Sequence, residues 1–159
     1  MKKMTVLCCA LLMASSLYAH EVTLKVALSP AGGFEGKSSK LKGEIKRDGN
    51  KFTAENLWVK VEELKTDNTL RDEHLHKHLN FEKSPKLTLT KVEAADGKGT
   101  GILTVNEVAK PINFVYKALG PKKLEATFKV KASDFKLKEA SYMGIGVVDL
   151  VEVVAIIDV

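Results

Sequence analysis

Three of the chain's four histidines lie in the nine-residue segment RDEHLHKHL, residues 71–79. His74, His76 and His78 could each offer an imidazole nitrogen to a transition-metal ion, and the carboxylates of the same segment could add oxygen. A zinc site usually needs three or four such ligands, oriented by further hydrogen bonds. Ligand type alone is a weak indication, so a metal-binding or metal-buffering protein is kept as the alternative function.

The local pattern predicts one short helix, near residues 69–79, and its Thr-x-x-Asp start resembles a capping box. On a helix, His74 and His78 share a face while His76 points roughly the opposite way. On an extended segment all three would share a face. We favour a solvated helix on which one histidine has a structural role, and we assign no metal.

The first residues have the layout of a secretory signal peptide. Lys2 and Lys3 form a basic start, residues 4–14 are almost wholly apolar, and small and polar residues lead to Ala19. The apolar run is too short for a stable membrane span. We expect cleavage after Ala19 and export to the periplasm, with secretion beyond it left open. Residues 20–159 then form a single domain.

Cleavage at this point would make His20 the N-terminal residue of the mature chain. A terminal amine and its own imidazole can chelate copper, so weak Cu(II) binding at His20 is a further hypothesis. A copper titration of the mature protein against a His20→Ala variant tests it.

Both cysteines lie in the leader, so the mature chain has none. Disulfides, thiolate metal sites and cysteine nucleophiles are thereby excluded. Removal of the two leader lysines lowers the formal net charge from +5 to +3, and the remaining lysines are spread along the chain. A nucleic-acid surface would cluster its basic residues, so we expect no nucleic-acid partner.

Apolar and polar residues alternate with a period of two along most of the mature chain. The clearest runs are residues 22–28, 112–118 and 124–132. Alternate side chains of a strand point to opposite faces, so each run predicts a strand with one buried face. The turn signals that join neighbouring runs as hairpins are residues 48–50, 96–99 and 120–121. The sequence therefore predicts an all-β fold, an extended antiparallel β-barrel of roughly eight strands with one short helix.

Two predicted strands depart from simple alternation. The apolar positions beginning at Phe52 are out of phase with those beginning at Leu57, which predicts a bulge near Asn56. Residues 147–159 are apolar on both faces, which predicts that a helix or loop covers their outer side.

Six short motifs follow one another through residues 20–159. They are VKVEELKTDN, RDEHL, SPKLTLTKV, GILTVNEVAKPI, SDF and the closing GIGVVDLVEVVAIIDV. This ordered set resembles the YceI-like domain family. The resemblance implies an extended lipocalin-like β-barrel in the periplasm that binds a lipid or polyisoprenoid. The chain departs from the family at Glu107 and Lys136, where the family commonly has glycine.

The same resemblance places Arg71, Asp72 and His74 on the family's RDxHL motif. We expect Asp72 to tie the helix to the barrel through charge-assisted hydrogen bonds. Arg71 and His74 either do the same or lie near the barrel mouth and meet a polar head group such as a phosphate.

Inward positions of the alternating strands would line the barrel. The candidates for contact with an apolar ligand chain are Phe114, Tyr116 and Phe128. Such residues often fill a solid core in small barrels, so both outcomes stay open.

The leading hypothesis is an exported, non-enzymatic binding protein for an amphiphilic lipid such as a polyisoprenoid, fatty acid or fatty amide. No nucleophile–base spacing, phosphate loop or carboxylate pair indicates an enzyme, and we expect no cofactor. The lipid or isoprenoid is the expected partner of a chain that does not span the membrane. The oligomeric state, including a homodimer, is left open.

Overall fold

The computed structural model describes residues 20–159, and the predicted signal peptide, residues 1–19, lies outside the described residues. The elements are β1 (Glu21–Ser29), β2 (Gly33–Ser38), β3 (Lys46–Asp48), β4 (Lys51–Lys60), η1 (Val61–Glu63), α1 (Thr69–His78), β5 (Lys86–Ala95), β6 (Lys98–Val105), β7 (Val108–Gly120), β8 (Lys123–Lys131), η2 (Ala132–Phe135), β9 (Ser141–Tyr142) and β10 (Ile145–Asp158). The elements η1 and η2 are short 3₁₀ helices.

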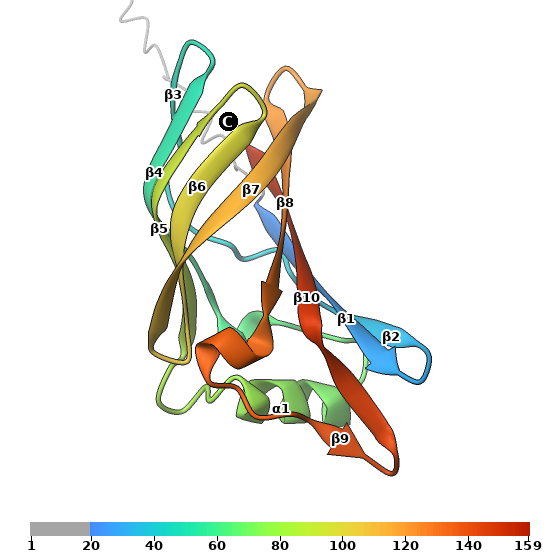
Figure 1. The fold of residues 1–159 in the computed structure, drawn as a ribbon. Coiled ribbons are helices and arrows are strands. Elements are labelled where there is room, and N and C mark those ends of the chain that lie inside the picture. The colour runs from blue at the N-terminus through green and yellow to red at the C-terminus, as the bar shows by residue number, and fades with distance from the viewer. Residues whose placement is uncertain (1–19) are drawn as a thin grey trace, which may run out of the picture.

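The strands of residues 20–159 form one antiparallel sheet in the order β2-β1-β10-β8-β7-β6-β5-β4-β3, with β9 paired to β10 (Figure 1). The strands from β3 to β8 are sequential neighbours, as the turn signals predicted. The final strand returns beside β8 and receives the N-terminal hairpin on its other side. The all-β antiparallel prediction and the single α-helix within residues 20–159 are confirmed.

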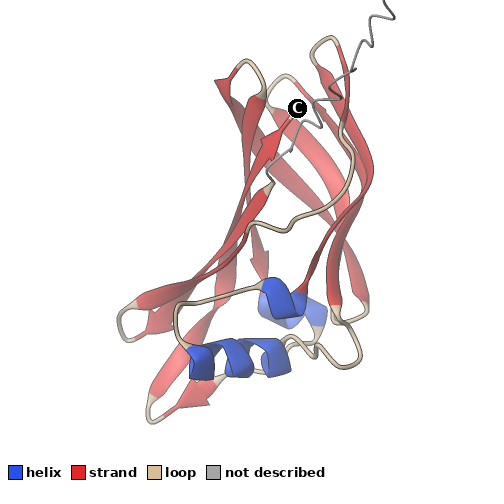
Figure 2. Ribbon diagram, turned by 180° about the vertical axis from the view of Figure 1, so that it is seen from behind, coloured by secondary structure: helices blue, strands red, loops and turns tan. Residues whose placement is uncertain are grey.

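The sheet curls around its core, and irregular segments bridge the space between its edge strands (Figure 2). Lys37 of β2 and Lys65 exchange both backbone hydrogen bonds at 2.8 Å, and Lys42 and Trp58 of β4 do the same. We call the end with the β3–β4 hairpin and the C-terminus the upper end. At the opposite, lower end, α1 and η2 lie across the opening (Figures 1 and 2).

In strands β4 and β5, the alternation of buried and exposed side chains shifts by one residue at the same level of the sheet. In β4 the buried side chains are Phe52 and Ala54, and then Leu57 and Val59, which is the predicted change. The register between β4 and β5 is unbroken, because β5 makes the same change beside Lys91, whose φ is 51°. The register shift therefore lies between β5 and β6, and the predicted bulge is displaced to the neighbouring strand.

The expected cover over the outer face of β10 is wrong, since Val148 and Leu150 remain 37% and 45% exposed. Pairing with β1 and β8 satisfies the backbone of β10 on both sides without such a cover. The turn signal at 48–50 is confirmed, because it joins β3 to β4, although β3 has only three residues.

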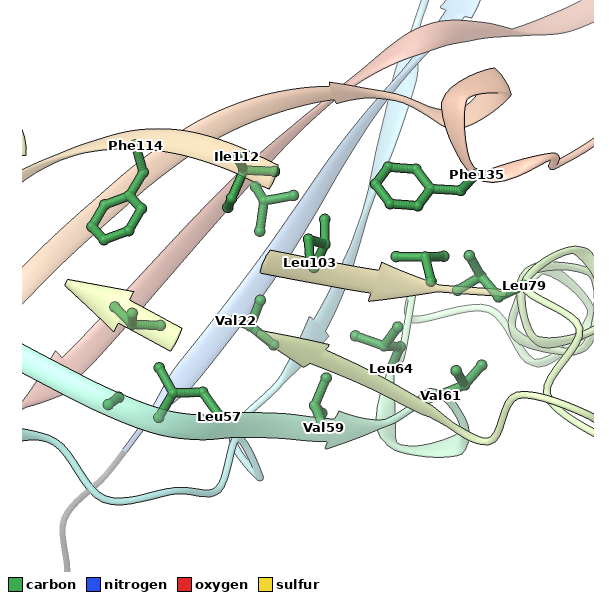
Figure 3. Packing of buried hydrophobic residues seen from close by; sticks show 14 of the residues in the cluster. Val22, Leu57, Val59, Val61, Leu64, Leu79, Leu103, Ile112, Phe114 and Phe135 are labelled. Atoms are coloured by element: carbon green, nitrogen blue, oxygen red, sulfur yellow. The ribbon is translucent and has the colours of Figure 1, made fainter. Parts of the chain in front are cut away.

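The core fills the inside of the curled sheet, and its most completely buried side chains lie at the lower end (Figure 3). Val61 of η1, Leu64 and Phe135 of η2 are the largest of them. Full burial of side chains of this kind stabilises a fold by about 1.5–3 kcal/mol each. The lower-end elements are thus held by apolar packing as well as by the polar contacts described below.

Candidate functional site

Helix α1 spreads the three histidines over different surroundings. His74 is exposed, whereas His76 and His78 are partly buried. The Nε2 atom of His76 lies 2.8 Å from the carbonyl oxygen of Leu64, and burial lowers the pKa of His78. The expected structural histidine is therefore His76. Within residues 20–159, no three histidine, cysteine or acidic side chains are grouped so that they could hold one metal ion.

The N-terminus of α1 is fixed by two side chains. Asn68 is the N-cap residue, and its Oδ1 accepts a hydrogen bond from the backbone N–H of Arg71 at 3.0 Å. Asp72, predicted to belong to a capping box with Thr69, instead reaches back to Thr66. Its Oδ1 accepts hydrogen bonds from the Thr66 hydroxyl and backbone N–H, both at 2.7 Å. These bonds hold the pKa of Asp72 below its usual range, and they tie the helix to the chain that leaves η1.

An Asp72→Ala variant should loosen α1 while leaving the sheet folded. The variant loses two charge-assisted hydrogen bonds. Loss of each corresponds to about tenfold more opening of the helix, so the amide hydrogens of α1 should exchange at least about tenfold faster. Hydrogen exchange measured by mass spectrometry or NMR tests this. Glu73→Ala is the matched control, because Glu73 is exposed on the same helix. Equal exchange rates in the two variants would contradict the assigned anchoring role of Asp72.

The pKa of His78 makes the docking of α1 sensitive to pH. In the unfolded segment, His78 is protonated as pH falls through its ordinary pKa of about 6.5. In the folded segment, burial delays this protonation until a lower pH. The stability contributed by neutral His78 is present above about pH 6.5 and is lost as pH falls through the lowered pKa.

We therefore expect hydrogen exchange in α1, corrected for the intrinsic pH dependence, to accelerate between pH 7 and pH 5. A His78→Gln variant should lack this acceleration, and the exposed His74→Gln variant should retain it. An identical pH profile in all three proteins would be inconsistent with this role of His78.

Arg71 and His74 lie on α1 away from the interior of the sheet. Arg71 is exposed, and its guanidinium carbon lies 5.2 Å from the ring centroid of Phe34 in β2. This cation–π contact joins the helix to the N-terminal hairpin. That Arg71 or His74 contacts the polar head group of a ligand stays a prediction. Because both residues lie on α1, such a contact would be at the lower end.

The interior of the sheet contains two apolar cavities. The lower cavity has a volume of about 130 Å³, and its wall is entirely apolar. Its lining includes Leu79, Leu103, Val130, Phe135 and Val153. It lies directly inside the cover that α1 and η2 form, because Leu79 follows α1 and Phe135 ends η2.

The upper cavity has a volume of about 60 Å³ and an equally apolar wall. Its lining includes Phe52, Phe114, Tyr116, Leu124 and Ile157. Phe52 and Tyr116 pack edge to face, with ring centroids 5.7 Å apart. Four residues line both cavities, and they are Leu57, Leu89, Phe128 and Ala155.

The sequence therefore placed three of its five candidate residues where they line an interior space, namely Phe114, Tyr116 and Phe128. It missed Leu57, Leu89 and Ala155, although alternation in their strands is the signal that marks inward positions. It also gave no role to Phe135 of the SDF motif, which closes the lower end.

Larger hollows of about 590 Å³ lie on the outside of the sheet, but charged side chains such as Lys51 and Glu93 line them. Ligand sites are usually concave and mostly apolar, which favours the interior.

Four hydrogen bonds connect η2 to other parts of the lower end. Asn80, just after α1, donates to the Oδ1 of Asn106 at 2.9 Å, and Asn106 donates to the carbonyl oxygen of Phe135 at 3.1 Å. On the far side of η2, Asp149 accepts from the Ser133 backbone N–H at 2.7 Å and from its hydroxyl at 2.6 Å. These bonds add to the apolar packing of Phe135 in holding η2 in place.

His20 is buried beside β10, and its Nδ1 accepts a hydrogen bond from the backbone N–H of Asp158 at 3.3 Å. Chelation of copper by the amine and imidazole of an N-terminal histidine uses this same nitrogen. Copper binding would therefore have to displace the contact between His20 and Asp158.

No helix in residues 20–159 has the length and apolar character needed to cross a membrane.

The family model of the YceI-like domain matches residues 18–158. Among solved structures, Burkholderia cenocepacia BcnA has a TM-score of 0.69 at 16% identity, covering 87% of this chain and 94% of that chain. A polyisoprenoid-binding domain from Saccharophagus degradans has a TM-score of 0.63 at 12% identity, covering 88% and 95%. At these identities the likeness shows the fold alone.

The Campylobacter jejuni YceI protein is 28% identical, with a TM-score of 0.56 over 67% of this chain and 72% of that chain. A search of curated proteins found no significant match.

Proposed function

Since the chain belongs to the YceI-like domain family, we propose that it is an exported, non-enzymatic protein that holds one amphiphilic lipid by its apolar tail inside the curled sheet. Candidate ligands are a polyisoprenoid, a fatty acid or a fatty amide. The observation that carries this proposal is the pair of cavities with entirely apolar walls, which are neighbours because four residues line both. The polyisoprenoid-binding domain of Saccharophagus degradans, which shares the fold, supports the ligand class.

The size of the interior limits the kind of ligand. Sites for drug-sized ligands usually measure about 300–1,000 Å³, whereas the lower cavity measures about 130 Å³. The ligand tail is therefore a single slender chain, and interior side chains turn aside as it enters. Each methylene buried in this way contributes about 0.8 kcal/mol, so a tail of several carbons is needed to offset the cost of immobilisation.

The head group has no partner inside, because an apolar wall cannot replace the water it would lose. We place it at the lower end, where α1 and η2 rather than the sheet form the cover and where Arg71 and His74 lie on the helix. A phosphate or carboxylate head would meet the Arg71 guanidinium there. Export to the periplasm rests on the leader sequence, and a homodimer is compatible with this arrangement.

The alternative metal-binding function gains no support from the described residues. His76 is engaged with a backbone carbonyl, and the three histidines of α1 face different surroundings. A non-enzymatic role is supported by the interior, which offers an apolar wall in place of an acid, base or nucleophile.

Organic extraction of the purified protein followed by mass spectrometry tests the proposal. We expect an amphiphile with a long apolar tail in close to one-to-one ratio with the protein. Repeated extraction without any lipid, together with no uptake of an added C15 polyprenyl alcohol, would refute the proposal.

A further inference from the structure

The wall that separates the two cavities contains a single aromatic side chain. Of its four residues, Leu57, Leu89 and Ala155 are aliphatic, and Phe128 has the largest side chain. A chain that passes from the lower to the upper cavity must move past this ring. The side chains of Leu57 and Leu89 end at Cδ and that of Ala155 at Cβ, so the Phe128 ring reaches furthest from the backbone.

Phe128 occupies a loosely supported position in the sheet. The ladder between β7 and β8 ends at the pair Val115↔Thr127, one residue before Phe128. Below this pair the two strands diverge, as Figure 1 shows. Phe128 is therefore paired only with Val153 of β10, and its side chain is partly rather than fully buried. Loss of a strand neighbour on one side gives the ring room to turn.

Aromatic contacts narrow the upper cavity. Phe52 and Tyr116, which line it, pack edge to face, and the Arg47 guanidinium lies 5.4 Å from the Phe52 ring centroid. The Phe114 ring lies directly over Gly99, where even a methyl group would overlap it. The lower cavity is the larger of the two, at about 130 Å³ against about 60 Å³. An apolar chain therefore fills the lower cavity first and meets Phe128 before the upper cavity.

We propose that Phe128 determines how deeply a ligand chain penetrates, and hence which chain lengths the protein binds. This inference rests on the proposed function. With Phe128 in its present position, the tail of a single-chain amphiphile fills the lower cavity alone. Carbons beyond that length remain outside and add no affinity, unless the ring turns away and opens the upper cavity.

Saturated fatty acids of even length from C8 to C18 are the probes. Calorimetric titration of the protein should show affinity rising about fourfold for each added methylene until the lower cavity is full, and then a break to a flat dependence. In a Phe128→Ala variant the break should move by several carbons to longer chains. Phe128→Leu should move it less and serves as a milder variant if the alanine variant does not fold.

A matched control lies on the opposite face of β8. Lys129 is the residue after Phe128, is exposed and lines neither cavity. Lys129→Ala should leave the break at the wild-type length. An unchanged break in the Phe128 variants would overturn the inference while leaving the proposed function intact. Absence of binding by the wild-type protein at every length would overturn both.

Discussion

A Phe135→Ala variant should lose about 3–5 kcal/mol of unfolding free energy, the largest stability effect that we expect for a single substitution in this protein. Phe135 is only 2% exposed, and its ring points from η2 into the interior near Leu103 and Leu79 (Figure 3). Truncation to alanine removes the buried ring and leaves a cavity that the rigid sheet cannot collapse to fill.

Urea denaturation followed by circular dichroism measures this loss. Phe135→Leu should lose less, because most of the apolar volume is kept. Val115→Ala is the surface control and should change stability by less than about 0.5 kcal/mol, since Val115 is 58% exposed. Equal midpoints for Phe135→Ala and Val115→Ala would show that η2 does not close the lower end by packing.

An Ala155→Phe variant should bind apolar chains at least about 100-fold more weakly than the wild type, a loss equivalent to three or four buried methylenes. Ala155 lines both cavities, and a benzyl group at this position would occupy the space that the ligand tail needs. Its cross-strand neighbours are Val22 and Ala126. An aromatic residue beside a β-branched one is a favourable pair in a sheet, so the fold should survive.

Binding of a C15 polyprenyl alcohol, measured by calorimetry, is the readout for this variant. Val154→Phe is the matched control, because Val154 is the adjacent residue of β10 and faces away from the cavities. It should bind like the wild type. A normal affinity in Ala155→Phe, with the variant folded, would place the ligand outside the sheet.

The strands and the helix could be predicted from the sequence because the patterns that mark them depend only on residues close together in the chain. Alternation at Phe114, Tyr116 and Phe128 identifies inward positions without knowledge of the partner strands, since each residue's face is set by its own backbone. The same logic located the phase change in β4. The bulge was predicted in β4, but the register shift lies between β5 and β6. The reason is that the inward-facing positions of β4 and β5 shift by one residue together, so their own pairing stays regular.

The contacts of α1 were harder to predict because they depend on where distant backbone groups lie. Asp72 bonds to Thr66 and His76 lies at the Leu64 carbonyl, and both partners belong to the segment that leaves η1. A helical wheel shows which side chains share a face, but it does not show which face meets this segment. The alternatives for the three histidines therefore stayed open until the fold was known.

Glu107 and Lys136 show a further limit of sequence patterns. The family commonly has glycine at both positions, which suggested altered turns. Both residues nevertheless adopt the left-handed conformation, with φ of 62° and 56°. The surrounding hairpin and η2 impose on these two residues a backbone conformation that non-glycine residues rarely adopt.

The division of the interior into two cavities could not be predicted from the sequence either. Whether inward side chains fill a barrel or leave space depends on the sum of many side-chain volumes against the curvature of the sheet. Leu57, Leu89, Phe128 and Ala155 come from four different strands, and only the tertiary structure brings them to one level.

A crystal structure of the protein grown with a C15 polyprenyl alcohol would show whether a lipid tail lies inside the sheet and enters from the end covered by α1 and η2. We expect continuous electron density for the chain from between Leu79 and Phe135 up to the Phe128 ring, with the hydroxyl at the lower end. Interior side chains packed together in its place, with the alcohol absent or bound only on the outer surface, would refute an interior lipid site.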